Sequence, residues 1–239
     1  MLCMCRIHEN PLGDEGIEKL ISELLALHGD TMLDAPDATT DRLERQNTIT
    51  NKPGCRSDTT TNDQSSGDDV VLNNALNDDT INQTPGKVNV LALKSLEIGA
   101  CGITTVSACA VAGLIRANVG ITSLSITGNK DIEAAGWAEI AESLEHNTVI
   151  NTLELHHNAL ENTGTSLISD GLTRNTSVHT IDLEGNHIGD EGAEKIQKML
   201  ELNGTLRTVH LRSGNEISES VLADIEHLIA ERQCPSNAT

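Results

Sequence analysis

The chain of 239 residues repeats one pattern every 28 or 29 residues, and this period constrains its fold more than any other feature. The clearest copy spans residues 181–206 and reads IDLEGNHIGDEGAEKIQKMLELNGTL. It begins with alternating apolar residues at Ile181 and Leu183, and it continues into a run with Ile196 and Leu200 at helical spacing. We therefore predict a strand–turn–helix unit that recurs along the chain.

Three columns of residues keep this period. The second apolar position of each strand is Ile98, Ile126, Leu155, Leu183 and Leu211, at spacings of 28, 29, 28 and 28. The turn position three residues later is Cys101, Asn129, Asn158 and Asn186, and in the last copy it arrives one residue late as Asn215. Asn118, Asn147, Asn175 and Asn203 form a third column at the helix ends.

Each column has a physical interpretation. Alternate strand residues face opposite ways, so Leu153 and Leu155 should point inward and Glu154 outward. The amide of Asn158 can satisfy backbone groups that the turn would otherwise bury unpaired. At the helix end, we expect Asn203 to adopt the left-handed conformation that often terminates helices.

The same signature divides the chain into four parts. Residues 1–28 are predicted to form a first repeat, with Cys5 and Ile7 inward and a helix over about 17–27. Residues 89–232 contain about five more repeats, including a C-terminal closing helix over about 218–232, and residues 233–239 form a tail. Because the chain starts inside a strand without a polar cap, we expect either a truncated start or a face that another subunit covers.

An acidic insertion rich in Thr, Asn and Asp, residues 29–88, interrupts the repeats. We predict that it is disordered, with at most a transient helical turn over 70–76, because it cannot bury enough apolar surface to offset its ordering entropy. Its functional interpretation is a docking or phosphorylation segment, and the alternative is a tolerated surface loop.

The repeats resemble those of leucine-rich repeat proteins of the ribonuclease-inhibitor-like class. The resemblance rests on residues 181–206 and 151–175, and in weaker form on 93–147 and 4–27. It implies an α/β leucine-rich repeat solenoid, a horseshoe segment with short parallel strands on the concave face and helices on the convex face, that binds proteins. NOD-like receptors, Ran GTPase-activating proteins and tropomodulins carry similar repeats, but no motif here allows their functional residues to be transferred.

The amino-acid composition limits the classes of partner that the protein can bind. The formal net charge of -20, from 36 acidic and 16 basic residues, argues against nucleic acid and anionic membranes. It fits a basic protein partner, and simple solubility is the alternative. Trp137 is the only aromatic residue, so any binding surface must be polar and charged.

The uncharged stretch 98–115 is long enough to suggest a membrane span, but it is rich in small residues and keeps the repeat register.

Thiol usage and the N-terminal sequence indicate a cytoplasmic protein, with a nuclear location also open. The six cysteines form no CxxC pair, and we interpret Cys5 and Cys101 as reduced packing residues. The first residues do not read as a signal peptide.

The outward strand positions are the candidate partner-binding residues. Between the two apolar strand residues the column reads Arg6, Glu97, Ser125, Glu154, Asp182 and His210, and the next outward column reads His8, Gly99, Thr127, His156, Glu184 and Arg212. From these we select Glu97, Glu154, His156, Asp182, Glu184, His210 and Arg212 as the candidate site for a basic partner. A merely solvated face is the alternative.

We predict no catalytic, cofactor or metal site. No GxSxG, HExxH or Gly-rich phosphate motif occurs, and Cys109 has no obvious base. Although His156, His157, His179 and His210 recur near carboxylates, their spacing is that of the repeat, whereas zinc needs converging ligands. The sequence thus predicts a non-enzymatic protein–protein interaction scaffold. The alternative is a GTPase-activating-type regulator of a Ran-like small GTPase. The sequence leaves the oligomeric state open.

Overall fold

The structure is a computed structural model that describes residues 3–8, 12–33 and 93–233. Most of the predicted insertion 29–88, including the helical turn expected over 70–76, lies outside these residues. The same holds for Cys55, Cys234 and the tail from residue 234 onward.

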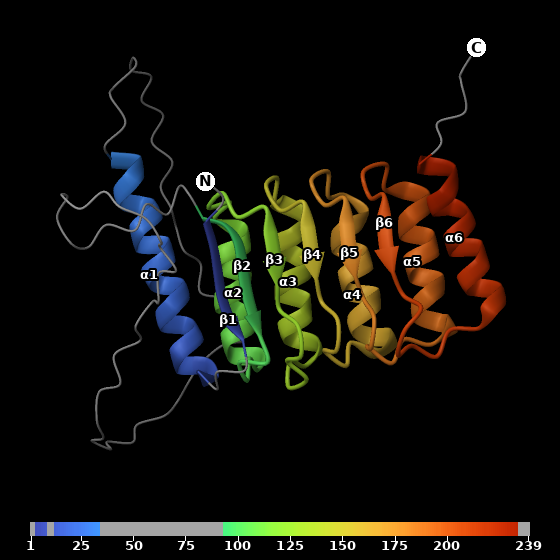
Figure 1. The fold of residues 1–239 in the computed structure, drawn as a ribbon, viewed down its shortest axis with the longest axis horizontal. Coiled ribbons are helices and arrows are strands. Elements are labelled where there is room, and N and C mark those ends of the chain that lie inside the picture. The colour runs from blue at the N-terminus through green and yellow to red at the C-terminus, as the bar shows by residue number, and fades with distance from the viewer. Residues whose placement is uncertain (1–2, 9–11, 34–92, 234–239) are drawn as a thin grey trace, which may run out of the picture. The chain divides into compact units, whose positions relative to one another are not determined.

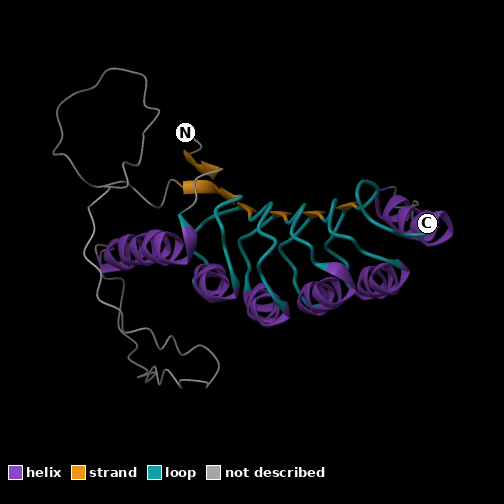
Figure 2. Ribbon diagram, turned by 90° about the horizontal axis from the view of Figure 1, so that it is seen from below, coloured by secondary structure: helices purple, strands orange, loops and turns teal. Residues whose placement is uncertain are grey.

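Six strands and six helices alternate along the described residues. They are β1 (Cys3–His8), α1 (Gly13–Leu33), β2 (Leu93–Gly99), α2 (Thr105–Arg116), β3 (Ser123–Ser125), α3 (Ala134–His146), β4 (Thr152–Glu154), α4 (Glu161–Thr173), β5 (Thr180–Asp182), α5 (Asp190–Leu202), β6 (Thr208–His210) and α6 (Glu219–Gln233). The strands form one parallel sheet in the order β1 to β6 (Figure 1). Figure 2 shows the strands in one layer and the helices along one side of it.

Equivalent residues of successive repeats pair across the sheet. Leu96 pairs with Leu124, Leu124 with Leu153, and Leu153 with Ile181. Each of these four side chains is at most 1% exposed. The repeat therefore sets the register, because a slip by one residue would turn every inward leucine or isoleucine outward.

The core lies between the strand layer and the helix layer and is almost entirely aliphatic. Leu153 and Leu155 are fully buried and Glu154 is half-buried, as the alternation predicts. Each fully buried leucine contributes about 1.5–3 kcal/mol of hydrophobic free energy. Trp137 is also buried, at 1% exposure, on the inward side of α3.

The turn asparagines satisfy backbone groups of their turns, as predicted, and they also connect adjacent repeats. The side-chain Oδ1 of Asn186 accepts hydrogen bonds from the backbone N–H groups of Asn158 (2.9 Å) and Leu160 (3.3 Å). Its Nδ2 donates to the carbonyl oxygens of Leu155 (2.9 Å) and Leu183 (3.0 Å). The amide thus satisfies buried polar groups in its own repeat and in the preceding one.

Cys101 occupies the same column, is fully buried and takes over part of this role. Its thiol Sγ lies 3.1 Å from the carbonyl oxygen of Ile7 and 3.3 Å from that of Gly99. A thiol is a weak donor, so this hydrogen bonding adds to what is mainly a packing position.

The left-handed conformation predicted for Asn203 is wrong. Asn203 is extended, with φ −81° and ψ 118°, whereas Asn118 is the member of its column that is left-handed, with φ 53°. The Oδ1 of Asn203 accepts from the N–H groups of Thr205 (2.7 Å) and Leu206 (2.8 Å). Its Nδ2 donates to the carbonyl oxygen of Asn175, the equivalent residue of the preceding repeat, at 2.9 Å. The side chain, rather than a left-handed backbone, satisfies this turn.

The first helix is longer than predicted, and the last agrees with its prediction to within one residue at each end. The first starts at Gly13 instead of about 17 and continues to Leu33, past the predicted start of the insertion at 29. The last spans Glu219–Gln233, close to the predicted 218–232. The uncharged stretch 98–115 comprises the end of β2, a turn and most of α2. Among the described residues, no helix combines the length and the hydropathy that crossing a bilayer requires.

Side chains from the start of one repeat's helix also cap the helix of the next repeat. The carboxylate of Asp14 accepts hydrogen bonds from the backbone N–H groups of Thr104 (3.0 Å) and Ser107 (3.3 Å) and from both hydroxyls. Asn162 Oδ1 accepts from the N–H groups of Gly189 (2.9 Å) and Gly192 (3.1 Å) at the start of α5. Burial acts to raise the pKa of Asp14, but the hydrogen bonds from Ser107 and Thr104 outweigh it and hold that pKa below its usual value.

Candidate functional site

We call the side of the sheet opposite the helices the strand face. The predicted outward column lies there in register: Arg6 pairs with Glu97, Glu97 with Ser125, Ser125 with Glu154, Glu154 with Asp182, and Asp182 with His210. The structure therefore brings five of the seven candidate residues close to one another in two adjacent rows, with Glu97 and Arg212 toward the two ends.

The centre of the strand face holds an acidic patch, which we define as Glu154, Asp182 and Glu184. All three side chains are half-buried, and Asp182 Oδ1 accepts a hydrogen bond from the backbone N–H of Glu184 at 2.9 Å. Glu154 and Glu184 form no ion pair with any described residue. Carboxylates on neighbouring strands repel each other, so a cation placed between them would be stabilised.

His156 lies at the edge of this patch. Its Nδ1 is 3.6 Å from Asp182 Oδ2, which is beyond hydrogen-bond distance, and this buried nitrogen has no hydrogen-bond partner within the described part of the chain. Its ring meets that of His157 edge-on, with centroids 5.5 Å apart. Within the described residues, no three His, Cys, Asp or Glu side chains are grouped to hold a metal ion.

The charges at the two ends of the strand face are paired within the protein. Arg6 donates two hydrogen bonds to the carboxylate of Glu97, one of them at 3.0 Å, and this contact raises the pKa of Arg6. Arg212 donates to Glu226 of α6 at 2.8 Å. Glu97 and Arg212 thus have a partner already, which the sequence prediction did not anticipate.

A row of hydroxyl side chains, which the sequence analysis missed, borders the acidic patch. Each strand from β2 to β6 has a serine or threonine two residues before its residue in the charged row. These side chains pair in register across the sheet and are all half-buried: Ser95, Ser123, Thr152, Thr180 and Thr208. The same two-residue alternation that selected Glu154 also predicts this row, since residues i and i+2 of a strand face the same way. These hydroxyls can donate to or accept from a bound chain.

The C-terminal end of the strand face has a small hollow of about 160 Å³ between β6 and α6. Glu184, His210 and Arg212 line its polar rim, and aliphatic side chains such as Leu211 and Ile225 line the rest. Three of the candidate residues thus surround one concavity.

The comparison with family models agrees with this architecture. A family model described as Leucine Rich repeat matches residues 174–196, which run from the end of α4 through β5 into α5. Among solved structures, the chain is similar to leiomodin-1 actin-binding site 2, with 16% identity and a TM-score of 0.45, over 51% of this chain and 87% of that chain. No curated protein matches the sequence. Residues 174–196 thus match a leucine-rich repeat, and the parallel strands, inter-repeat asparagines and alternating helices give the described residues the fold of an α/β leucine-rich repeat solenoid.

Proposed function

We propose that the protein is a non-enzymatic interaction scaffold of the cytoplasm or nucleus that binds a basic protein segment on its strand face. The observation that carries the proposal is the acidic patch, three half-buried carboxylates of which Glu154 and Glu184 lack an ion-pair partner among the described residues. Repeat solenoids present extended surfaces for such binding.

The rest of the strand face supports a chain lying across the strands. The hydroxyl row offers hydrogen bonds beside the patch. Ser125 and Thr127, which lie next to Glu154, have small side chains that are only 5% and 6% exposed, so they do not project from the strand face. A lysine or arginine of the partner would meet the patch while its backbone contacts the hydroxyls. Because the patch is solvent-accessible, we expect association to slow as salt screens it.

The test replaces all three patch residues by lysine (Glu154→Lys, Asp182→Lys, Glu184→Lys) in the full chain. Affinity purification followed by mass spectrometry then identifies the proteins that wild type retains and the variant loses. We expect basic partners among those lost, and their direct binding to the purified chain should weaken with increasing salt.

A matched control reverses three exposed helix-layer carboxylates (Glu194→Lys, Glu201→Lys, Asp224→Lys), which changes the net charge by the same amount. Partners that bind the strand face should stay with this control. If the patch variant keeps every wild-type partner, the proposed role of the patch is wrong.

The alternative function, activation of a Ran-like small GTPase, is tested separately by measuring single-turnover GTP hydrolysis with a panel of small GTPases. A scaffold leaves the hydrolysis rate of each GTPase unchanged, whereas an activator accelerates it by orders of magnitude.

A further inference from the structure

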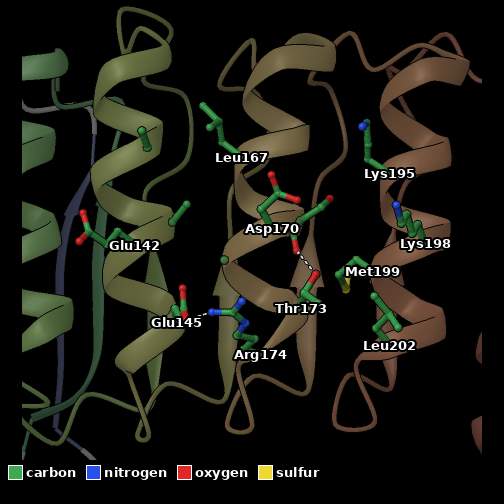
Figure 3. Close-up of a pocket in the computed structure, with 14 residues that line it drawn as sticks. Glu142, Glu145, Leu167, Asp170, Thr173, Arg174, Lys195, Lys198, Met199 and Leu202 are labelled. Carbon is green, nitrogen blue, oxygen red and sulfur yellow. Dashed lines mark hydrogen bonds and ion pairs between the residues drawn. The ribbon is translucent and has the colours of Figure 1, made fainter.

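A large hollow lies on the helix layer, away from the strand face. It has a volume of about 450 Å³ and lies over α4, with α3 on one side and α5 on the other (Figure 3). A second hollow of about 320 Å³ continues it between the first turns of α4 and α5, and the two share Leu167 and Lys195. We call the two together the helix groove.

The groove lies where α4 carries small residues and packs close to α3. A Cβ atom added at Gly171 would lie 2.4 Å from the backbone oxygen of Ala141, so α4 approaches the backbone of α3 as closely as only glycine permits. Toward the first turn, Thr163 and Ser166 keep the outer side of α4 low. Both α4 and α5 have 13 residues, so the groove can extend for about 20 Å.

The groove carries apolar side chains that a soluble protein usually covers. Leu202 of α5 is 64% exposed, one of the most exposed large apolar side chains among the described residues. Leu167 of α4 is half-buried, whereas Met199, which lies beside Leu202 in the lining, is buried (Figure 3). Apolar residues from adjacent helices therefore face one elongated hollow.

In the larger hollow, the exposed charges without an ion pair have opposite signs on the two sides, and Glu191 of α5 lines only the smaller hollow. Lys195 and Lys198 are exposed on the side of α5 that faces α4, and neither forms an ion pair with a described residue (Figure 3). On the other side, Glu142 of α3 and Asp170 of α4 are also exposed and without such a pair. In a chain with a net charge of -20, two unpaired lysines beside an apolar groove favour a ligand with carboxylates at that position.

We propose that the helix groove binds an amphipathic helix of a partner protein, with acidic residues on one flank of its apolar stripe and basic residues on the other. Leu167 and Leu202 contact the stripe, as in other complexes where a helix occupies an apolar groove. Lys195 and Lys198 face the acidic flank, and Glu142 and Asp170 face the basic flank. This site is independent of the strand face, so the scaffold can hold two partners on opposite sides.

The probe is a synthetic, fluorescein-labelled helix of about 14 residues, which matches the length of the groove. It carries leucines at helical spacing, glutamates on one flank and lysines on the other. A second peptide has the same composition with both charges mixed on each flank. Binding to the full chain is measured by fluorescence anisotropy, and we expect the charge-segregated peptide to bind at least about tenfold more tightly than the mixed one.

Variants of the chain locate the binding. The double substitution Lys195→Glu and Lys198→Glu should weaken binding of the segregated peptide about tenfold, whereas Lys19→Glu with Lys130→Glu changes the net charge equally and should leave it unchanged. Leu202→Ser should also weaken binding, and because Leu202 is exposed the melting temperature should stay that of wild type. The strand-face triple variant should bind the peptide normally.

Three results of the peptide-binding assay would each overturn the proposal: no binding of the segregated peptide, equal binding of the two peptides, or unchanged affinity after the double substitution of the groove lysines. Self-association of wild type that Leu202→Ser abolishes would assign the groove to a second copy of this chain instead of a partner helix. That outcome also overturns the proposal, while leaving the proposed function of the strand face intact.

Discussion

Replacing Asn186 by alanine isolates the contribution of one turn asparagine to the stability of the solenoid. The side chain is 0% exposed, and its Oδ1 is the acceptor for the backbone N–H groups of Asn158 and Leu160. The carbonyl oxygens that it also contacts keep other donors, since Leu155 still receives Asn158 Nδ2 at 2.8 Å and Leu183 still receives Asn215 Nδ2 at 3.0 Å. Two N–H groups are therefore left unpaired.

The expected cost follows from this count. An unsatisfied buried polar group costs about 1–3 kcal/mol, so two cost about 2–6 kcal/mol of unfolding free energy. A domain is typically stable by about 5–15 kcal/mol, so the loss should be large. Partial relaxation of the turn toward water would bring the value to the lower end.

Urea unfolding measures this loss, followed both by circular dichroism and by the fluorescence of Trp137, the only tryptophan, which is buried in α3. Coincident transitions justify a two-state treatment, which repeat proteins do not always obey. Asn151→Ala is the control, because Asn151 is exposed and its Nδ2 contacts only the ring nitrogen of His179; we expect less than about 0.5 kcal/mol. Equal stability of the two variants would refute the assigned role of the turn asparagines.

Two further predictions concern contacts between repeats. Asp14→Asn should lower stability at neutral pH by about 1 kcal/mol. Because the pKa of Asp14 is lowered in the folded state, the contribution of its carboxylate is complete above the unfolded value of about 3.9 and is lost as pH falls through the folded pKa. The stability difference should therefore shrink in denaturation series at decreasing pH, and a difference that grows on acidification would contradict this cap. Gly171→Ala should lower the free energy of unfolding by more than about 2 kcal/mol, because the new Cβ forces α4 away from Ala141. Gly113→Ala places its Cβ in open space within a helix, so it should raise the free energy of unfolding by about 0.5–1 kcal/mol. Thermal unfolding of both variants checks the pair, and equal effects would refute the close approach of α3 and α4.

Much of the fold was predictable from local patterns. The two-residue alternation around Leu153 and Leu155 indicates which strand side chains are buried, and the 28-residue spacing indicates which residues pair across the sheet. The strand register therefore follows from the sequence, and so does the position of Glu154 beside Asp182. The hydroxyl row follows from the same alternation.

Conformations that depend on an adjacent repeat were not predictable in this way. Asparagine tolerates a left-handed backbone, which made that prediction reasonable for Asn203, but the carbonyl oxygen of Asn175 in the preceding repeat lies where the side chain can donate to it. The side-chain hydrogen bonds then satisfy the turn with an extended backbone. The choice between the two depends on a contact 28 residues away.

The sequence by itself determined the repeat, the burial of its leucines and the order of charges along the strand face, because all three depend only on the periods of strand and helix. Only the tertiary structure decided which of those charges are available. Arg6 reaches Glu97 across 91 residues of sequence, and Arg212 reaches Glu226 on a helix that packs beside its strand. The helix groove likewise lies where Gly171 of α4 packs against α3. Such pairings depend on distances between stacked elements, and a one-dimensional pattern does not contain those distances.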